Sequence, residues 1–198
     1  MLDPDMLLAS ASPRRSELLR QIGVRFCQMS VDIDESQVPG ESAVDYVSRM
    51  AMEKAQAGWA RQAGALPALG ADTTVVCDQY IFGKPADKQD ALNMLSRLSG
   101  ATHQVLSAVA ICLGDELALR VSKTSVRFRP ISPEEECLGY WETGEPQDKA
   151  GAYGIQGMGA VFVAHIEGSY SGVVGLPLTQ TAELLGLFNI PVWRPLAH

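Results

Sequence analysis

Two arginines stand at the start of an expected helix, where basic side chains are unfavourable. The segment Ser12-Pro13-Arg14-Arg15 places a helix-capping serine and a proline before them. Because the helix dipole is positive at this end, each cation there costs up to about 1 kcal/mol. Exposed backbone N–H groups and two guanidinium groups form a clamp for phosphate, to which the Ser10 hydroxyl can add a donor. The alternative is that both arginines reach solvent or pair with distant acids.

An aspartate interrupts an otherwise apolar segment, Gly70-Ala71-Asp72-Thr73-Thr74. A carboxylate in a buried strand needs a partner or a metal, because burying an unpaired charge is expensive. In a functional interpretation, Asp72 binds Mg²⁺ and orients or deprotonates a water molecule. In a structural interpretation, it pairs with a neighbouring lysine or with the backbone amides of a turn. The rarity of aspartate in strands favours the functional interpretation.

Two lysines and a glutamate are further candidates for the same chemistry. Lys54 is in phase with the apolar positions of its expected helix, although a lysine there usually extends to solvent. Lys84 lies in a tight turn, Phe82-Gly83-Lys84-Pro85, that is able to aim an ammonium group into a cleft. Glu35 belongs to an acidic loop, which is either a solvated surface or a site for a hard metal ion.

A glycine-rich segment between positions 151 and 159 carries one side chain suited to a nucleobase. The glycines would let the backbone approach a planar ligand, although glycine-rich loops are weak evidence of binding. Gln156 offers both a hydrogen-bond donor and an acceptor, as pairing with a base edge requires.

Several common catalytic signatures do not occur in the sequence. It contains no GxxxxGK[ST] loop, no GxGxxG after an expected strand and no GxSxG segment. With only three histidines, a Ser-His-Asp triad is also disfavoured. Cations and carboxylates remain, and they favour phosphate chemistry assisted by a divalent metal ion.

Short apolar runs alternate with amphipathic segments and must position these residues. We expect strands at 6–9, 26–31, 69–76, 80–82, 104–113, 117–128 and 161–166, with Gly114-Asp115 as a hairpin turn. We expect helices at 12–22, 42–60, 91–98, from 132 onward and near 179–188. This order predicts an α/β fold with a mixed sheet.

Length, composition and charge limit the classes of protein that remain. The 198 residues correspond to one domain, or to one domain with two lobes. A net charge of −7 disfavours binding to a nucleic acid polymer, and no apolar run approaches the ~20 residues that a membrane span requires. The four cysteines are irregularly spaced, which predicts buried thiols in a reducing cytoplasm.

A series of motifs runs in order along nearly the whole chain, from residue 7 to about residue 188. These motifs are Ala9-Ser10-Ala11-Ser12-Pro13-Arg14-Arg15, Glu53-Lys54-Ala55, Gly70-Ala71-Asp72-Thr73, Gly83-Lys84-Pro85, Leu98-Ser99-Gly100, Asp148-Lys149-Ala150-Gly151-Ala152-Tyr153-Gly154-Ile155-Gln156-Gly157 and Val174-Gly175-Leu176-Pro177-Leu178. Together they resemble the Maf family of nucleotide pyrophosphatases. The resemblance implies one domain over residues 1–198, with an elongated mixed sheet, flanking helices and two lobes around a cleft, as in inosine triphosphatase-like proteins. It also implies a cytoplasmic enzyme, which in this family is compatible with a homodimer.

The resemblance further implies an activity and residue roles. A nucleoside triphosphate would be hydrolysed between the α and β phosphorus atoms, with Mg²⁺ or Mn²⁺ as cofactor. Asp72 would accept the proton of the attacking water and bind the metal, with Glu35 as a second metal or cleft residue. The triphosphate would be held by Ser10, Arg14, Arg15, Lys54 and Lys84, the two lysines acting in catalysis.

Three positions resemble the dTTP/UTP pyrophosphatase branch of the family, namely Arg14, Thr73 and Gln156. The sister branch, which resembles 7-methyl-GTP pyrophosphatases, tends to carry tryptophan, glutamine and glutamate there. A glutamine suits the O4 and N3–H groups of uracil or thymine, whereas a glutamate suits guanine. Thr73 and Gln156 are therefore expected to contact a pyrimidine nucleotide.

Two other hypotheses stay open. The first is a non-catalytic nucleotide-binding regulator of cell division or septum formation, a role also attached to this family. The second is an enzyme that removes modified pyrimidine nucleotides and for which dTTP is a surrogate. Release of pyrophosphate from dTTP or UTP would distinguish an enzyme from the regulator. Comparing kcat/KM for modified and ordinary pyrimidine nucleotides would test the second hypothesis.

Overall fold

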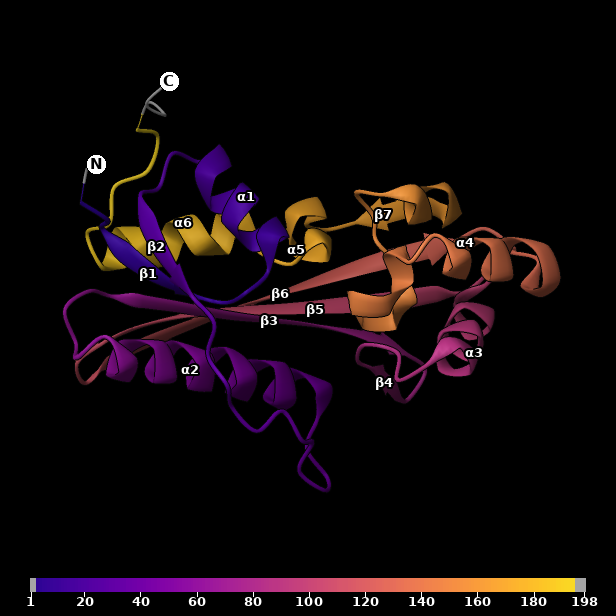
Figure 1. Ribbon diagram of the computed structural model, residues 1–198, viewed down its shortest axis with the longest axis horizontal. Coiled ribbons are helices and arrows are strands. Elements are labelled where there is room, and N and C mark those ends of the chain that lie inside the picture. Colours follow the sequence, from indigo (N-terminus) through magenta and orange to yellow (C-terminus); the bar gives the residue numbers. More distant parts are fainter. Residues whose placement is uncertain (1–2, 195–198) are drawn as a thin grey trace. The chain divides into compact units, whose positions relative to one another are not determined.

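A mixed β-sheet with helices on its faces organises the protein, whose computed structural model describes residues 3–194. The strands are β1 (Met6–Ala9), β2 (Phe26–Met29), β3 (Ala68–Cys77), β4 (Tyr80–Phe82), β5 (Thr102–Leu113), β6 (Glu116–Phe128) and β7 (Val163–Glu167). The helices are α1 (Pro13–Gln21), α2 (Ala43–Arg61), α3 (Lys88–Leu98), α4 (Leu138–Glu142), α5 (Tyr170–Val174) and α6 (Leu178–Leu187) (Figure 1). The strand order is β2-β1-β3-β5-β6-β7, with β4 paired to β3. The expected α/β fold with a mixed sheet is confirmed.

The chain divides into two compact units. Unit 1 contains residues 3–72, Ser107–Ser122 and residues 175–194, and unit 2 contains Thr73–Leu106 and Lys123–Val174. Strands β3, β5 and β6 each contribute residues to both units. The expectation of one domain with two lobes around a cleft stays a prediction.

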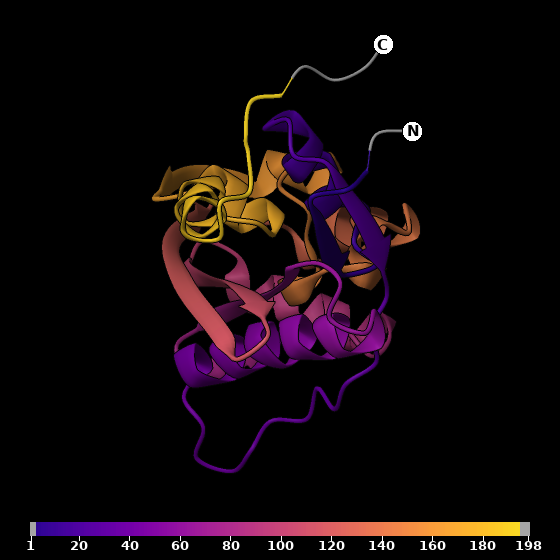
Figure 2. The same cartoon turned by 90° about the vertical axis from the view of Figure 1, so that its left-hand side faces the viewer.

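In unit 1, parallel strands lie between two layers of helices. Strand β1 pairs in parallel with β2, Met6 opposite Phe26, and with β3, Leu7 opposite Ala68. Helix α2 covers one face of these strands, and α1 and α6 lie on the other (Figures 1 and 2). All four residues of β1 are buried, as expected for a parallel strand covered on both faces.

Side-chain caps fix where α1 and α2 begin. The Ser12 hydroxyl accepts a hydrogen bond from the Arg15 amide at the start of α1, and Pro13 occupies the first turn. The Ser42 hydroxyl accepts from the Asp45 amide at the start of α2. Both helices therefore start where the sequence predicts, which places the first turn of α1 directly after β1.

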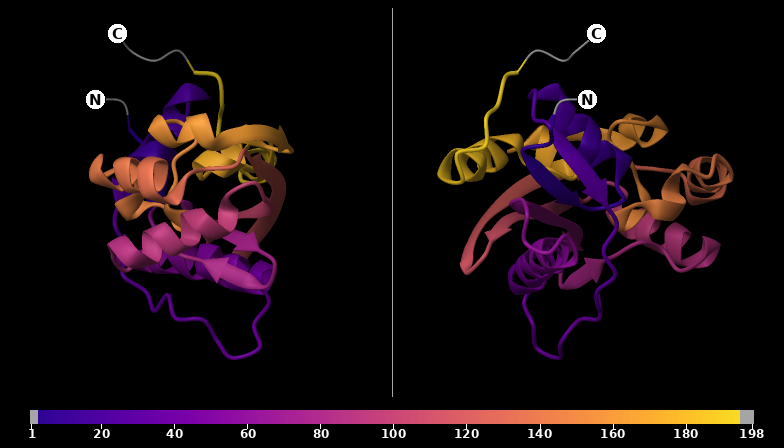
Figure 3. Two further views of the ribbon diagram at one scale, coloured as in Figure 1. Left: turned by 90° about the vertical axis from the view of Figure 1, so that its right-hand side faces the viewer. Right: turned by 60° about the vertical axis from the view of Figure 1, so that its left-hand side comes forward.

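In unit 2, aromatic rings from β5, β6 and the glycine-rich segment pack together. Helix α3 packs against α4 (Figure 3). The ring of Phe128 makes edge contacts with His103 and Tyr153 at centroid distances of 4.9 and 4.7 Å. His103 is 1% exposed and lies 2.9 Å from the Tyr153 hydroxyl through Nε2. This buried histidine is part of the packing of unit 2.

A few elements differ from the expectations. Strand β2 ends at Met29 rather than at residue 31. Residues Met158–Phe162 form a 3₁₀ segment, so the following strand begins at Val163 rather than at residue 161. Helix α5, Tyr170–Val174, was not expected, because five residues are too few to give a helical hydrophobic period.

All four cysteines are free thiols, but one is not buried. Cys77, Cys112 and Cys137 are buried, whereas Cys27 is exposed. The expectation was wrong for Cys27 because β2 is the edge strand of the sheet. Within residues 3–194, no helix combines the length and the apolar character that crossing a bilayer requires.

The buried histidine predicts an acid sensitivity of the fold. Burial lowers the pKa of His103 from 6.5 to about 4. Its contribution to stability is therefore complete above pH 6.5 and is lost as the pH falls toward 4. We expect this residue alone to remove about 2 kcal/mol of unfolding free energy between pH 7 and pH 5.

Urea titrations of two variants at both pH values measure this effect. His103→Gln should reduce the difference between pH 7 and pH 5 by that amount. His165→Gln, at an exposed position, should leave the difference unchanged. Equal pH dependence in wild type and His103→Gln would contradict the prediction.

Candidate functional site

The turn between β1 and α1 holds the first of the expected site residues. The Ser10 hydroxyl accepts hydrogen bonds from the Ser12 amide at 3.2 Å and from Nη1 of Arg15 at 3.1 Å. Arg15 also donates from Nε to the carbonyl of Gly175 at 3.0 Å. Its guanidinium group is therefore fixed against the turn. The interpretation in which Arg15 simply reaches solvent is wrong.

Charges from separate elements act on Arg15. Burial lowers the pKa of its guanidinium group, while the negative charges of Asp72 and Glu35 act in the opposite direction. The positive charge of Arg14, in the same first turn of α1, lowers the pKa further. The first turn of α1 therefore shares one electrostatic environment with the candidate aspartate and glutamate.

Lys54 joins those two carboxylates. Its Nζ lies 2.8 Å from Oδ1 of Asp72, on β3, and 2.7 Å from Oε1 of Glu35, in the segment between β2 and α2. Lys54 is 9% exposed, so its ammonium group does not extend to solvent as the alternative interpretation expects. The contact satisfies Asp72, as its structural interpretation requires. The structural interpretation requires only one partner for Asp72. It does not explain why Lys54 also contacts Glu35.

A glycine allows β3 to lie close enough to α2 for this contact. A Cβ atom at Gly70 would collide with the carbonyl oxygen of Ala51 and the amide nitrogen of Ala55, and would lie 3.0 Å from the Ala55 Cα. Position 70 therefore requires glycine, because the backbone of α2 lies where a Cβ atom would be. Because Lys54 is adjacent to Ala55 and Asp72 is two residues beyond Gly70, this close approach sets the distance between the lysine and the aspartate.

Gly70→Ala is expected to destabilise the protein by about 2–3 kcal/mol, because backbone atoms of α2 cannot move aside without repacking the helix. Thermal or urea unfolding measures the loss. Gly186→Ala is the matched control, since a Cβ at this exposed position of α6 would meet nothing within 4 Å. A Gly70→Ala variant as stable as wild type would show that α2 and β3 do not pack this closely.

Tyr46 is a residue at this site that the sequence analysis missed. Its hydroxyl donates a hydrogen bond to the carbonyl of Glu35 at 3.1 Å. Burial, followed by the charges of Asp72 and Glu35, raises the pKa of Tyr46. Tyr46 precedes Lys54 by eight residues, which places both on one face of α2. That spacing is the signal that would have identified it.

The other expected site residues belong to unit 2. Thr73 follows Asp72 on β3 and is half-buried, and Lys84 is exposed in the turn after β4. Gln156 is exposed in the glycine-rich segment. Their roles as substrate ligands stay predictions.

The glycine-rich segment is folded around a glutamate rather than left open. The Glu145 carboxylate accepts hydrogen bonds from the Tyr140 hydroxyl at 2.7 Å, the Met158 amide at 2.8 Å and the Gly159 amide at 3.1 Å. A Cβ at Gly159 would lie 2.5 Å from the Tyr140 hydroxyl, and one at Gly157 would collide with Glu145. Packing on Glu145 and Tyr140 therefore explains why glycine occurs at these two positions, without a planar ligand.

Two carboxylates of unit 1 provide oxygen ligands of the kind that Mg²⁺ takes. Asp72 and Glu35 both contact Lys54, which brings their oxygens together. Within residues 3–194, no group of three or more His, Cys, Asp and Glu side chains is arranged to hold a metal ion. A pair of carboxylates still fits Mg²⁺, which commonly binds one or two of them and takes its remaining ligands from water and substrate phosphates.

A family model and curated relatives match most of this chain. A family model described as Maf-like protein matches residues 5–188. A dTTP/UTP pyrophosphatase of Saccharophagus degradans is 53% identical over 196 residues, covering 98% of this chain and 93% of that protein. A dTTP/UTP pyrophosphatase of Pseudoalteromonas translucida is 55% identical over 181 residues, covering 91% and 95%. A solved nucleoside-triphosphatase / dITP/XTP pyrophosphatase of Mycobacterium abscessus aligns with 93% of this chain and 96% of its own, at a TM-score of 0.44 and 17% identity.

Proposed function

This chain belongs to the Maf-like protein family, and we propose that it hydrolyses dTTP and UTP to the nucleoside monophosphate and pyrophosphate. The observation that carries the proposal is the position of Lys54 between the carboxylates of Asp72 and Glu35, in the electrostatic environment of Arg15. Cations and carboxylates in this arrangement suit hydrolysis of a phosphoanhydride. The names of relatives with at least half of their residues identical support the same reaction.

In the proposed reaction, a water oxygen attacks the α-phosphorus of the bound nucleotide. The bond between the α-phosphorus and the bridging oxygen breaks, and pyrophosphate leaves with that oxygen. Asp72 holds the attacking water and receives its proton, while Oδ1 stays bonded to Lys54. The ammonium group of Lys54 keeps this carboxylate in one orientation throughout.

The cations of unit 1 bind the triphosphate in this proposal. Arg14 and the backbone N–H groups at the start of α1 bind phosphate oxygens, as helix N-termini commonly do. Arg15 is already fixed by Ser10 and Gly175, so it presents its charge without further ordering. Charges fixed in advance act on the developing negative charge of the leaving pyrophosphate without a cost of reorganisation.

Asp72 and Glu35 would hold the divalent cation, Mg²⁺ or Mn²⁺. A cation bound there would neutralise phosphate charge and lower the barrier to displacement of pyrophosphate. The two carboxylates already converge on one positive group, which supports their assignment as cation ligands. Removing divalent cations with a chelator should therefore abolish turnover.

The preference for pyrimidines is assigned to Gln156. Its amide offers a donor and an acceptor, which match the O4 and N3–H groups of uracil and thymine. The exposed position of Gln156 leaves the amide accessible to a ligand. A cytoplasmic location belongs to the same proposal and is supported by four free thiols, which persist in a reducing compartment.

The direct test is to incubate the purified protein with dTTP or UTP and Mg²⁺ and to identify both products. The proposal predicts pyrophosphate and the monophosphate in equal amounts. Orthophosphate and a nucleoside diphosphate would contradict cleavage between the α and β phosphorus atoms. Saturable binding without any product would favour the regulator. A far higher kcat/KM for modified pyrimidine triphosphates would identify those as the substrates.

A further inference from the structure

The segment that carries Glu35 has no helix or strand to hold it in place. It joins β2 to α2, and the Glu35 side chain is 56% exposed. Its carboxylate nevertheless lies 2.7 Å from the buried ammonium group of Lys54. An exposed side chain on an irregular segment samples many positions unless polar contacts hold its backbone. The contacts that hold this backbone therefore determine whether Glu35 reaches the site.

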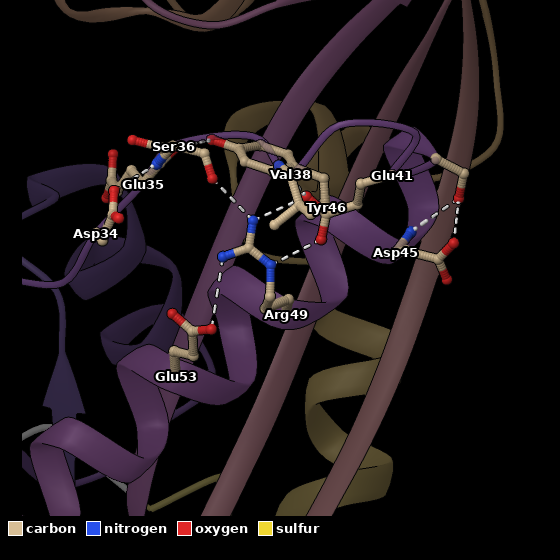
Figure 4. A network of polar contacts seen from close by, with 10 residues as sticks. Asp34, Glu35, Ser36, Val38, Glu41, Asp45, Tyr46, Arg49 and Glu53 are labelled. Atoms are coloured by element: carbon tan, nitrogen blue, oxygen red, sulfur yellow. Dashed lines mark hydrogen bonds and ion pairs between the residues drawn. The ribbon is translucent and has the colours of Figure 1, made fainter.

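Arg49 of α2 makes those contacts on the C-terminal side of Glu35. Its Nε and Nη2 bind the two carboxylate oxygens of Glu41 at 2.7 and 2.8 Å (Figure 4). Nη2 also donates to the carbonyl of Ser36 at 2.9 Å. One guanidinium group thus binds two points of the segment, five residues apart, and ties both to α2.

Local hydrogen bonds complete the fold of this segment. The Glu41 carboxylate accepts from the Val38 amide at 3.2 Å, and the Glu41 amide donates to the Val38 carbonyl at 3.0 Å. The Tyr46 hydroxyl binds the carbonyl of Glu35 itself at 3.1 Å (Figure 4). The side chains of Glu41 and Arg49 are 10% and 25% exposed, so their bidentate pair is only partly shielded from solvent. Charge-assisted bidentate pairs are stronger than single hydrogen bonds between neutral groups.

We propose that Arg49, assisted by Tyr46, is a positioning residue that holds the segment 35–41 on α2 so that the Glu35 carboxylate stays against Lys54 beside Asp72. The effect on catalysis rests on the proposed function. Arg49 acts at the backbone of Ser36 and at Glu41, whereas Glu35 acts at the site. A lysine at position 49 keeps the charge but not the planar fork, so it cannot bind both oxygens of Glu41 and the Ser36 carbonyl together.

Kinetics of dTTP hydrolysis test the proposal with the intact protein. Arg49→Gln should lower kcat by about 10- to 100-fold, the scale expected when a catalytic group moves by about 1 Å. Arg49→Lys should recover only part of this loss, and Tyr46→Phe, which keeps the ring, should give a smaller loss. Arg120→Gln is the matched control, because Arg120 pairs with Glu183 on an exposed part of the same unit.

A double-mutant cycle separates positioning from general stability. If Arg49 acts through Glu35, the double variant Arg49→Gln/Glu35→Gln should be no slower than Glu35→Gln alone. Losses that multiply in the double variant would overturn the proposal, as would unchanged kcat in Arg49→Gln. A residue that only stabilises the fold would lower the unfolding temperature and give multiplying losses.

Hydrogen exchange provides a readout that does not depend on activity. In Arg49→Gln, the amides of Val38 and Glu41 should exchange faster, while amides inside β1 stay protected. Unchanged exchange at Val38 and Glu41 would show that Arg49 does not anchor the segment. An inactive wild type would reject the proposed function, and the exchange experiment would still decide whether the anchor exists.

Discussion

Asp72→Asn is expected to reduce the release of pyrophosphate from dTTP by about 10³-fold while the protein stays folded. Asparagine has the same size and keeps an oxygen that accepts the hydrogen bond from Lys54, which lies 2.8 Å from Oδ1 in the wild type. It cannot accept a proton from water and supplies no negative charge to a metal ion. Loss of a general base costs about 10²–10⁴-fold, and loss of a cation ligand adds to this.

The kinetic measurement needs controls for folding and for charge. Asp115→Asn removes one negative charge at the exposed turn between β5 and β6 and should keep wild-type kcat. Circular dichroism and the urea midpoint should be close to wild type for both variants. A folded Asp72→Asn variant with more than a tenth of wild-type kcat would contradict the role assigned to Asp72.

The starts of α1 and α2 were predictable because the signals for them are local. Ser12 and Ser42 cap the two helices that they were expected to begin, since the residues that decide a cap lie within one turn. Asp72 was singled out by its place in an apolar strand, whereas the phase of Lys54 on α2 favoured a lysine that extends to solvent, and only the family resemblance indicated a role for it. Their mutual contact follows once α2 packs on β3, which Gly70 permits.

The hydrogen bonds that hold the site residues in place were not predictable, because they join parts of the chain that are distant in sequence. The carbonyl of Gly175 accepts from Arg15 across 160 positions of sequence, and nothing near either residue signals this. The pairing of Arg49 with Glu41 spans eight positions and requires the irregular path of the segment before α2. Glu145 was likewise missed, since its partners are mainly amides of a segment 13 or 14 residues later.

Lys54→Met is expected to lower kcat/KM by about 10²–10³-fold, the loss typical when one fixed electrostatic contact to the transition state is removed. The variant leaves Asp72 and Glu35 facing each other without the ammonium group that both now contact. Removing one partner of a fully buried ion pair costs about 3–5 kcal/mol. Because the Glu35 side chain is 56% exposed and can turn to solvent, the loss of stability here should be smaller.

Kinetics and urea unfolding of Lys54→Met measure the two effects separately. Lys88→Met is the control, since Lys88 is exposed at the start of α3 and should tolerate the change in both assays. A Lys54→Met variant with wild-type kcat/KM would contradict a role for the ammonium group at the site.

The double variant Lys54→Met/Asp72→Asn distinguishes the chemical role of the pair from a packing role. Removing both charges eliminates the uncompensated carboxylate, so the double variant should be more stable than Lys54→Met alone. If the pair served only to satisfy a buried aspartate, activity would return together with stability. We expect stability to return while activity stays as low as in Asp72→Asn, because the methionine and asparagine of the double variant provide no carboxylate that accepts a proton from water.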